Sequence, residues 1–145
     1  DGVFFSGPTA VGKSDVAAQI CRQQKGMIVS ADSVQAYEGV QIGANKPTLE
    51  ERQETPHILV DVADHNLTYT AADWNRDALH AIEELLQSSA PSIENSIDDE
   101  QATTTDEQLM LEQRRERKER ISKEIGTARS KKGYGVEENL LPVVC

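Results

Sequence analysis

The spacing of apolar residues predicts alternating strands and helices over the first part of the chain. Residues 3–5 and 27–29 are short apolar runs with the character of buried strands. Between them, residues 12–24 carry apolar side chains four positions apart, which predicts a helix. These pairs are Val16 with Ile20 and Ala17 with Cys21. A helix that joins two buried strands favours a parallel βαβ unit and therefore an α/β fold.

Farther along, the pattern predicts two more strands and further helices. Capping-box spacing, which marks a helix start, occurs at Thr48–Glu51 and at Thr104–Glu107. Residues 58–60 are apolar and predict a third strand, whereas residues 71–87 have an apolar stripe at helical spacing. The stripe comprises Trp74, Ala78, Ile82 and Leu85. Residues 140–144 are again strand-like, and we expect the chain to end within that strand.

The composition changes after residue 87, where Ser, Thr, Asp and Glu replace most apolar side chains. Residues 88–107 bury too little apolar surface to offset the entropy of ordering, so we predict disorder there. Residues 109–125 are compatible with a helix, and the mixture of arginines, lysines and glutamates in it is typical of a solvated one. We therefore predict three regions: 1–87, the first part of an α/β core; 88–135, a charged insertion; and 136–145, a return to a core strand.

Charge and composition narrow the function classes. The 145-residue chain has a formal net charge of −10, which argues against a non-specific polyanion binder, because neutralising phosphates needs a surplus of Lys and Arg. Two cysteines give no disulfide framework. No apolar run approaches the roughly 18 residues that span a bilayer, so we expect no membrane segment. The sequence leaves the location open between cytoplasm, mitochondrion and plastid.

The motif with the most specific chemistry lies between the first predicted strand and the first predicted helix. Gly7-Pro8-Thr9-Ala10-Val11-Gly12-Lys13-Ser14 fits the phosphate-loop pattern G-x-x-x-x-G-K-[ST]. Its glycines permit backbone conformations that turn successive N–H groups toward one anion, and the helix N-terminus adds its positive end. Lys13 would neutralise the terminal phosphate, and Ser14 would be a ligand of Mg²⁺. We therefore predict a diphosphate site made of Gly7, Pro8, Thr9, Ala10, Val11, Gly12, Lys13 and Ser14.

A second candidate, Asp32, follows the second predicted strand. The carboxyl ends of strands in an open α/β sheet face the ligand crevice, so we expect Asp32 near the phosphate loop. There its carboxylate would bind Mg²⁺ or accept a proton from a nucleophile. The local sequence equally fits an Asx turn that only closes the loop after the strand.

Taken in order, these motifs resemble the tRNA dimethylallyltransferase family, also called tRNA isopentenyltransferases. Besides the phosphate loop, the resemblance rests on S-A-D-S-V-Q-A-Y-E-G-V-Q-I-G-A-N-K-P-T from Ser30, T-P-H-I-L-V-D-V from Thr55 and Y-T-A-A-D-W-N-R-D-A from Tyr69. It covers residues 2–87 and 140–145. Several ordered motifs at family spacing are far more specific than the phosphate loop alone.

The resemblance implies a transferase that moves a dimethylallyl group from its diphosphate to N6 of the adenosine beside the anticodon in certain tRNAs. It implies that the phosphate loop holds the prenyl diphosphate, where relatives with the same loop hold ATP, with Mg²⁺ near Ser14. Asp32 would be the general base, and Asp32, Ser33, Val34 and Gln35 would contact the tRNA. The expected fold is a P-loop NTPase-like, three-layer domain with an incomplete parallel sheet and a partly disordered, partly helical insertion. The expected partners of this monomeric chain are tRNA and dimethylallyl diphosphate.

Some positions depart from the family pattern, and three other interpretations stay open. Ala44 and Asn45 stand where Thr-Ala is usual, Ile58 replaces a frequent His, and residues 88–135 have no counterpart that we recognise. The alternatives are an adenylate isopentenyltransferase that uses free nucleotide, a small-molecule kinase with the same loop, and a chain without activity. Because the family's later strands would follow Cys145, we expect the chain by itself to be weakly active or inactive.

Overall fold

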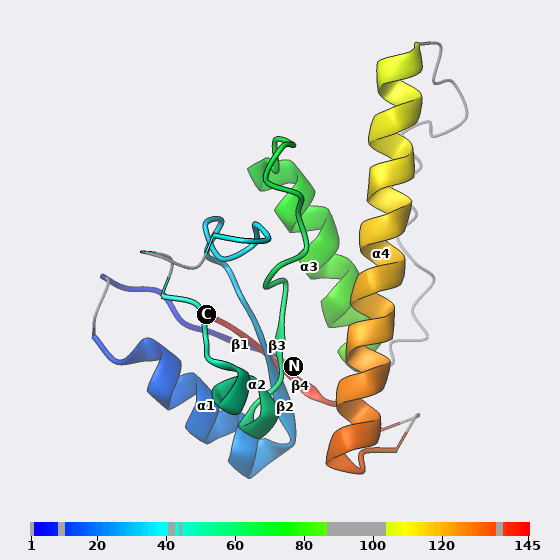
Figure 1. Ribbon diagram of the computed structural model, residues 1–145. Coiled ribbons are helices and arrows are strands. Elements are labelled where there is room, and N and C mark those ends of the chain that lie inside the picture. The colour runs from blue at the N-terminus through cyan, green and yellow to red at the C-terminus, as the bar shows by residue number, and fades with distance from the viewer. Residues whose placement is uncertain (1, 9–10, 41–42, 44, 87–103, 136–137) are drawn as a thin grey trace.

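The computed structural model describes residues 2–8, 11–40, 43, 45–86, 104–135 and 138–145 (Figure 1). Its elements are β1 (Val3–Phe4), α1 (Lys13–Gln24), β2 (Gly26–Val29), α2 (Leu49–Glu54), β3 (His57–Ile58), α3 (Ala71–Leu86), α4 (Thr105–Lys132) and β4 (Leu141–Val144). These four strands form one parallel sheet in the order β1-β4-β2-β3. The last strand in the sequence therefore separates the first two in space.

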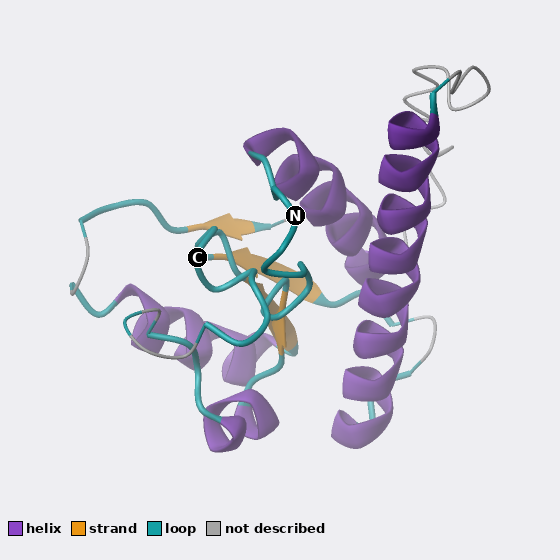
Figure 2. Cartoon of the chain, turned by 45° about the horizontal axis from the view of Figure 1, so that its top comes forward, coloured by secondary structure: helices purple, strands orange, loops and turns teal. Residues whose placement is uncertain are grey.

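Helices cover both faces of this sheet, which gives three layers (Figures 1 and 2). α1 packs on β2 and β4 from one side, α3 packs on the same two strands, and α4 lies along α3. Side chains of β2 alternate between the faces: Ile28 joins a small core cluster with α1, whereas Met27 and Val29 join a larger cluster with α3. The predicted α/β class with a small, incomplete parallel sheet is confirmed.

The helix ends follow the capping residues in the sequence. The hydroxyls of Thr48 and Thr104 each accept a hydrogen bond from the amide of the residue three positions later. Those later residues are glutamates, and their carboxylates accept a hydrogen bond from the amide of the capping threonine. Both predicted capping boxes are therefore confirmed. α4 ends at Gly133, whose φ of 70° is in the left-handed region that favours glycine.

The third strand is shorter than the apolar run 58–60 predicts. β3 ends at Ile58, because Leu59 and Asp61 adopt φ angles of 66° and 58° and so leave the extended region. The chain bends there, and the amide of Val62 donates to the carbonyl of Ala36 at 2.8 Å. Residues that look like strand by hydrophobicity therefore form a bend against the segment that follows β2.

On α1, the inward stripe is narrower than predicted. Ala17 and Cys21 are buried in the small cluster, as expected. Val16 is 46% exposed, and Ile20 is only partly buried against that cluster. Burial raises the pKa of the Cys21 thiol to about 12.

α4 is more closely integrated with the core than a solvated helix. Ile121, Ile125 and Arg129 are buried, so that expectation is wrong for the second half of the helix. Its first turns are exposed, including Leu109 and Met110. The Arg129 guanidinium donates to four backbone carbonyls, those of Glu84, Leu85, Gly135 and Glu138. The boundaries of the three predicted regions stay a prediction, and most of the segment predicted to be disordered lies outside the described residues.

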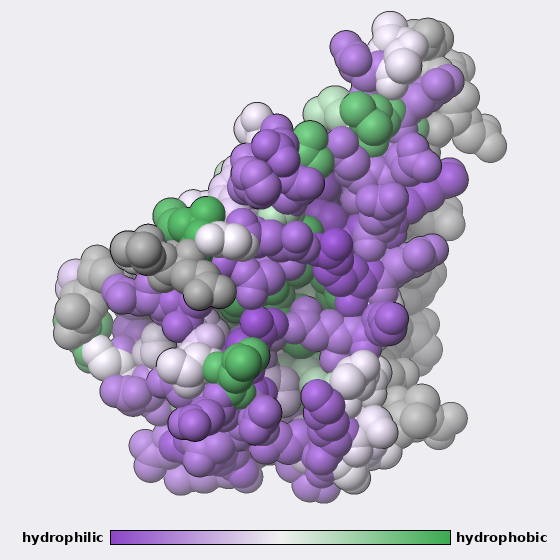
Figure 3. Space-filling model, in the orientation of Figure 1, coloured by the Kyte–Doolittle hydropathy of each residue, from purple (hydrophilic) through white to green (hydrophobic). Residues whose placement is uncertain are grey.

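The face of the molecule in Figure 3 is mostly hydrophilic, with small and separate apolar patches. Phe4 and Leu49 are the most exposed of the large apolar side chains that the structure describes, at 72% and 76%. Among the described helices, none has the length and apolar character needed to cross a membrane.

Candidate functional site

The glycine-rich loop joins β1, at the edge of the sheet, to α1. Gly7 and Gly12 have φ angles of 153° and 77°, which residues with side chains rarely adopt. Gly12 is also the N-cap of α1 and has no side chain with which to cap it. The first amides of α1 therefore remain directed toward the loop with the positive end of the helix behind them. Thr9 and Ala10 of the predicted site lie outside the described residues.

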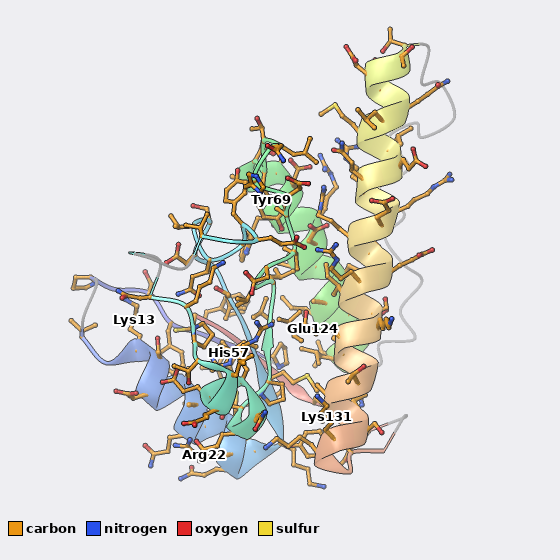
Figure 4. All side chains as sticks on the ribbon, in the orientation of Figure 1. Lys13, Arg22, His57, Tyr69, Glu124 and Lys131 are labelled. Carbon is orange, nitrogen blue, oxygen red and sulfur yellow. The ribbon has the colours of Figure 1, made fainter. Side chains whose placement is uncertain are left out.

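Lys13 folds back over this loop. Its ammonium donates to the carbonyls of Gly7 at 2.7 Å and Pro8 at 2.6 Å. Ser14 follows as the second residue of α1 and is exposed, as is Val11. Figure 4 places Lys13 on the opposite side of the molecule from α4. One positive charge, a helix N-terminus and two glycines in unusual conformations thus meet at one exposed place.

The residues of this loop are compatible with a magnesium–diphosphate pair. Mg²⁺ usually keeps several waters and takes one or two protein oxygens together with substrate phosphates. Ser14, an exposed residue that follows Lys13 in α1, could supply one such oxygen through its hydroxyl. Among the described residues, no group of three or more His, Cys, Asp or Glu side chains forms a separate metal site.

Asp32 and the phosphate loop both follow the carboxyl ends of their strands, on the same side of the parallel sheet. The amide of Phe5, at the end of β1, donates to Val144 at 2.9 Å, and the amide of Ala31, after β2, donates to Cys145 at 2.8 Å. β4 lies between the two strands, and neighbouring strands are about 4.8 Å apart, so β1 and β2 are roughly 10 Å apart. Gly7 and Asp32 each follow these matched positions by one or two residues.

The segment after β2 forms the Asx turn considered as an alternative for Asp32. Oδ1 of Asp32 accepts a hydrogen bond from the amide of Val34 at 2.9 Å. The side chain is nevertheless exposed, as are Ser33 and Val34, whereas Gln35 is partly buried. The turn therefore orients the carboxylate and leaves it accessible, so the two interpretations of Asp32 are compatible with each other.

Sequence reasoning missed the side chains that hold this turn. Trp74, predicted only as a core residue of α3, donates its indole N–H to the carbonyl of Ser30 at 2.8 Å. The Ser30 hydroxyl donates to Oε1 of Gln35 at 3.0 Å, and Nε2 of Gln35 donates to the Asn45 carbonyl at 3.0 Å. The Trp74 bond spans 44 residues, and the two Gln35 bonds span five and ten residues without a recognisable motif, so no local pattern indicates them.

Lys46, in the Lys-Pro pair of the segment that begins at Ser30, takes part in an ion-pair cluster around Asp61. Its ammonium lies 2.6 Å from Oδ1 of Asp61 and also donates to the carbonyl of Tyr37. Arg52 bridges Oδ2 of Asp61 and the Glu124 carboxylate of α4, at 3.2 and 3.0 Å. Burial raises the pKa of Glu124, and Arg52 offsets only part of this effect. The cluster therefore connects Lys46 to the segment after β3, through Asp61, and to α4, through Arg52 and Glu124.

A second charged network joins α3 to α4. Oδ2 of Asp77, a buried residue of α3, accepts hydrogen bonds from the Tyr69 hydroxyl and from Nε of Arg117, both at 2.9 Å. The Arg117 guanidinium lies 5.3 Å from the centre of the Tyr69 ring and also pairs with Asp73. Burial, together with the negative charge of Asp77, raises the pKa of Tyr69. Figure 4 shows Tyr69 well away from Lys13, so this network lies outside the candidate site.

A groove of about 290 Å³ lies between the first half of α4 and the segment 62–69. Its walls include Leu67, Tyr69, Leu109 and Arg117. The groove has none of the glycines or helix amides that bind phosphate, so we place the candidate site at the loop and Asp32.

Comparison with known proteins identifies relatives over the first part of the chain. Residues 35–94 match the family model described as IPP transferase. The tRNA dimethylallyltransferase of Alkaliphilus metalliredigens is 43% identical over 81 residues, covering 56% of this chain and 26% of the relative. That of Thermomicrobium roseum is 48% identical over 83 residues, covering 57% and 25%. The chain thus spans about a quarter of the length of the curated relatives that it matches.

Solved structures agree with this relationship. The tRNA delta(2)-isopentenylpyrophosphate transferase of Staphylococcus epidermidis has a TM-score of 0.53 at 32% identity, over 56% of this chain and 27% of its own. A eukaryotic dimethylallyltransferase acting on tRNA has a TM-score of 0.50 at 20% identity, over 99% of this chain and 23% of its own. The second likeness concerns the fold alone, and it takes in nearly the whole chain. The resemblance predicted from the sequence is confirmed.

Proposed function

We propose that this chain, as a relative of the tRNA dimethylallyltransferases, forms the diphosphate-binding and base-positioning part of an enzyme that transfers a dimethylallyl group to tRNA. The acceptor would be N6 of the adenosine beside the anticodon. One observation supports this proposal: the phosphate loop and Asp32 both follow the carboxyl ends of strands in the same parallel sheet, and β4 lies between these two strands. The two strands are roughly 10 Å apart, so the prenyl group and the adenine would lie above the end of β4 between the loop and Asp32.

In this proposal, residues Gly7 to Ser14 hold the diphosphate of dimethylallyl diphosphate. Backbone amides and the N-terminus of α1 bind its oxygens, and the Lys13 ammonium exchanges its loop carbonyls for the leaving phosphate. Ser14 would hold Mg²⁺, which neutralises part of the diphosphate charge when bound. Stabilising the departing diphosphate is the main electrostatic task, because the departure leaves an allylic cation.

The transfer forms one bond and breaks another. The lone pair of adenine N6 forms the bond to C1 of the dimethylallyl group, and the C1–O bond breaks with its electron pair going to the diphosphate. The N6 proton then goes to the Asp32 carboxylate, which must lie within hydrogen-bond reach of it. Asp32, Ser33 and Val34 are exposed at the tip of their turn, which suits contact with an extruded nucleotide of the anticodon loop.

A single-turnover assay tests this proposal. Excess protein is mixed with dimethylallyl diphosphate, Mg²⁺ and an anticodon stem-loop RNA, and the RNA mass is followed for the gain of one isopentenyl unit. We expect Lys13→Ala to weaken diphosphate binding by roughly a hundredfold. We expect Asp32→Asn to lower the transfer rate by a similar factor while diphosphate binding is kept.

The matched control is Asp64→Asn. Asp64 is also exposed, and its Oδ1 accepts from the amide two residues on, at 2.8 Å, as Asp32 does. If loss of an Asx-turn carboxylate were the cause, both variants would be impaired equally, and the base role of Asp32 would be refuted. Prenylation of free AMP in place of the RNA would identify an adenylate isopentenyltransferase, and ATP turnover without prenyl transfer would identify a kinase.

A further inference from the structure

The turn that carries Asp32 is held at both ends by hydrogen bonds of Ser30, Gln35 and Trp74. At its start, Nε1 of Trp74 donates to the Ser30 carbonyl at 2.8 Å. At its end, Oε1 of Gln35 accepts from the Ser30 hydroxyl at 3.0 Å, and Nε2 of Gln35 donates to the Asn45 carbonyl at 3.0 Å. We call Ser30, Gln35 and Trp74 the clamp.

The clamp is less exposed than the tip of the turn, since Ser30 is buried and Gln35 and Trp74 are partly buried. Ser30 is 3% exposed, whereas Asp32 is exposed and its Oδ1 accepts a hydrogen bond from the Val34 amide. An exposed side chain on a short turn takes its direction from the backbone beneath it. The orientation of the Asp32 carboxylate is therefore set largely by how firmly the clamp fixes the ends of the turn.

Trp74 connects this turn to the most firmly packed part of the molecule. It belongs to α3 and packs against the larger core cluster. The preceding residue, Asp73, accepts hydrogen bonds from Thr70 and Arg76 and pairs with Arg117 of α4. Through the indole N–H of Trp74, the position of α3 therefore fixes the backbone at Ser30, which lies two residues before Asp32.

We propose that Trp74 and Gln35 are positioning residues that act through Ser30 to direct the Asp32 carboxylate. This inference rests on the proposed role of Asp32 as the base. A proton acceptor has to lie within hydrogen-bond reach of its donor, and a displacement of about 1 Å can cost a hundredfold in rate. The competing explanation is that Trp74 only fills space in the core, in which case losing its N–H affects stability alone.

The decisive variant replaces Trp74 by its benzothienyl analogue, which keeps the ring shape and has sulfur in place of the N–H. Trp74→Phe is the genetically encoded counterpart. Ile82→Ala is the packing control, because Ile82 lies two turns along α3 and packs on the same cluster without touching Ser30. Gln35→Leu removes both amide bonds, and Gln35→Glu restores an acceptor for the Ser30 hydroxyl.

The two main quantities for each variant are the hydrogen-exchange rate of the Val34 amide and the single-turnover transfer rate. The concentration of dimethylallyl diphosphate that gives half of the maximal transfer rate is measured as a check on diphosphate binding. We expect the analogue, Trp74→Phe and Gln35→Leu to speed Val34 exchange and slow transfer, each by about tenfold. We expect the half-saturating concentration of dimethylallyl diphosphate and the hydrogen exchange of amides in α1 to stay unchanged. Gln35→Glu regains part of the rate, and Ile82→Ala lowers stability without a change in either quantity.

The outcomes separate this inference from the proposed function. Unchanged Val34 exchange in the analogue would refute the clamp. Faster exchange with an unchanged transfer rate would refute its role in positioning Asp32. If Asp32→Asn leaves the single-turnover rate unchanged while Val34 exchange still responds to the analogue, the clamp is a structural device and the proposed role of Asp32 as the base is refuted.

Discussion

The two faces of the sheet differ in how much they bury. Among the described residues, the cluster on the α3 face contains fifteen buried side chains, whereas the cluster on the α1 face contains four: Ala17, Cys21, Ile28 and Val143. The phosphate loop lies on the lightly packed side, between the edge strand β1 and α1. The Asp32 turn is anchored through Trp74 to the heavily packed side. The two halves of the candidate site therefore inherit different rigidity.

This difference suggests how the two halves divide their tasks. A loop that binds an anion gains stability from the ligand itself, so it can be built on a thin core. A general base gains nothing comparable from a small ligand and has to be held in place before the substrate arrives. The ionic network between α3 and α4 then helps to hold the half of the candidate site that carries Asp32.

The largest expected effect comes from removing the cation of that network. Arg117→Ala leaves the buried carboxylate of Asp77 without its arginine, which costs about 4 kcal/mol of unfolding free energy. Urea denaturation measures this loss. Arg115→Ala, at an exposed position of the same helix, should change stability by less than about 0.5 kcal/mol. A loss below about 1 kcal/mol for Arg117→Ala would show that α4 does not anchor this half.

A cavity in the larger cluster should have the next largest effect. Leu85 is a fully buried residue of α3. Leu85→Ala should lower the free energy of unfolding by about 3 kcal/mol, because apolar burial is lost and a cavity remains. Val16→Ala on α1 removes a side chain that is 46% exposed, and should cost less than about 0.5 kcal/mol. Equal losses in thermal denaturation would contradict the unequal packing of the two faces.

The cap of α2 should contribute less than either core position. Thr48→Ala removes the hydroxyl that accepts from the Glu51 amide, and should cost about 1 kcal/mol. Thr48→Ser keeps the hydroxyl and should retain most of the stability. Urea midpoints of the two variants compare them directly, and identical losses would mean that the methyl group, not the cap, is what matters.

The smallest effect concerns acid. Burial tends to raise the pKa of Asp73, but hydrogen bonds from Thr70 and the charge of Arg117 outweigh it and lower the pKa below the usual 3.8. A lowered carboxyl pKa contributes stability that is complete above the usual value and is lost as pH falls through the lowered one. Urea midpoints across acidic pH should therefore show wild type and Asp73→Asn converging as pH falls. A constant difference between them would contradict this linkage.

Much of the architecture was predictable because it depends on local patterns. Periodicity predicted α1 and α3, and the two capping boxes predicted where α2 and α4 begin. The third strand was predicted too long, since hydrophobicity cannot indicate the left-handed backbone of Leu59 and Asp61. The burial of half of α4 was missed, because three buried positions are diluted among charged ones.

The sequence by itself determined most of the order of elements and the resemblance to the tRNA dimethylallyltransferases, because each depends on residue types at short and fixed spacings. The tertiary structure alone decided that β4 separates β1 from β2, that Trp74 and Gln35 hold the Asp32 turn, and that Lys46 pairs with Asp61. Apart from the local bond between Ser30 and Gln35, these contacts join residues that lie ten or more positions apart along the chain. Their partners are chosen by which surfaces meet when the layers pack, and that choice leaves no periodic signal in the sequence.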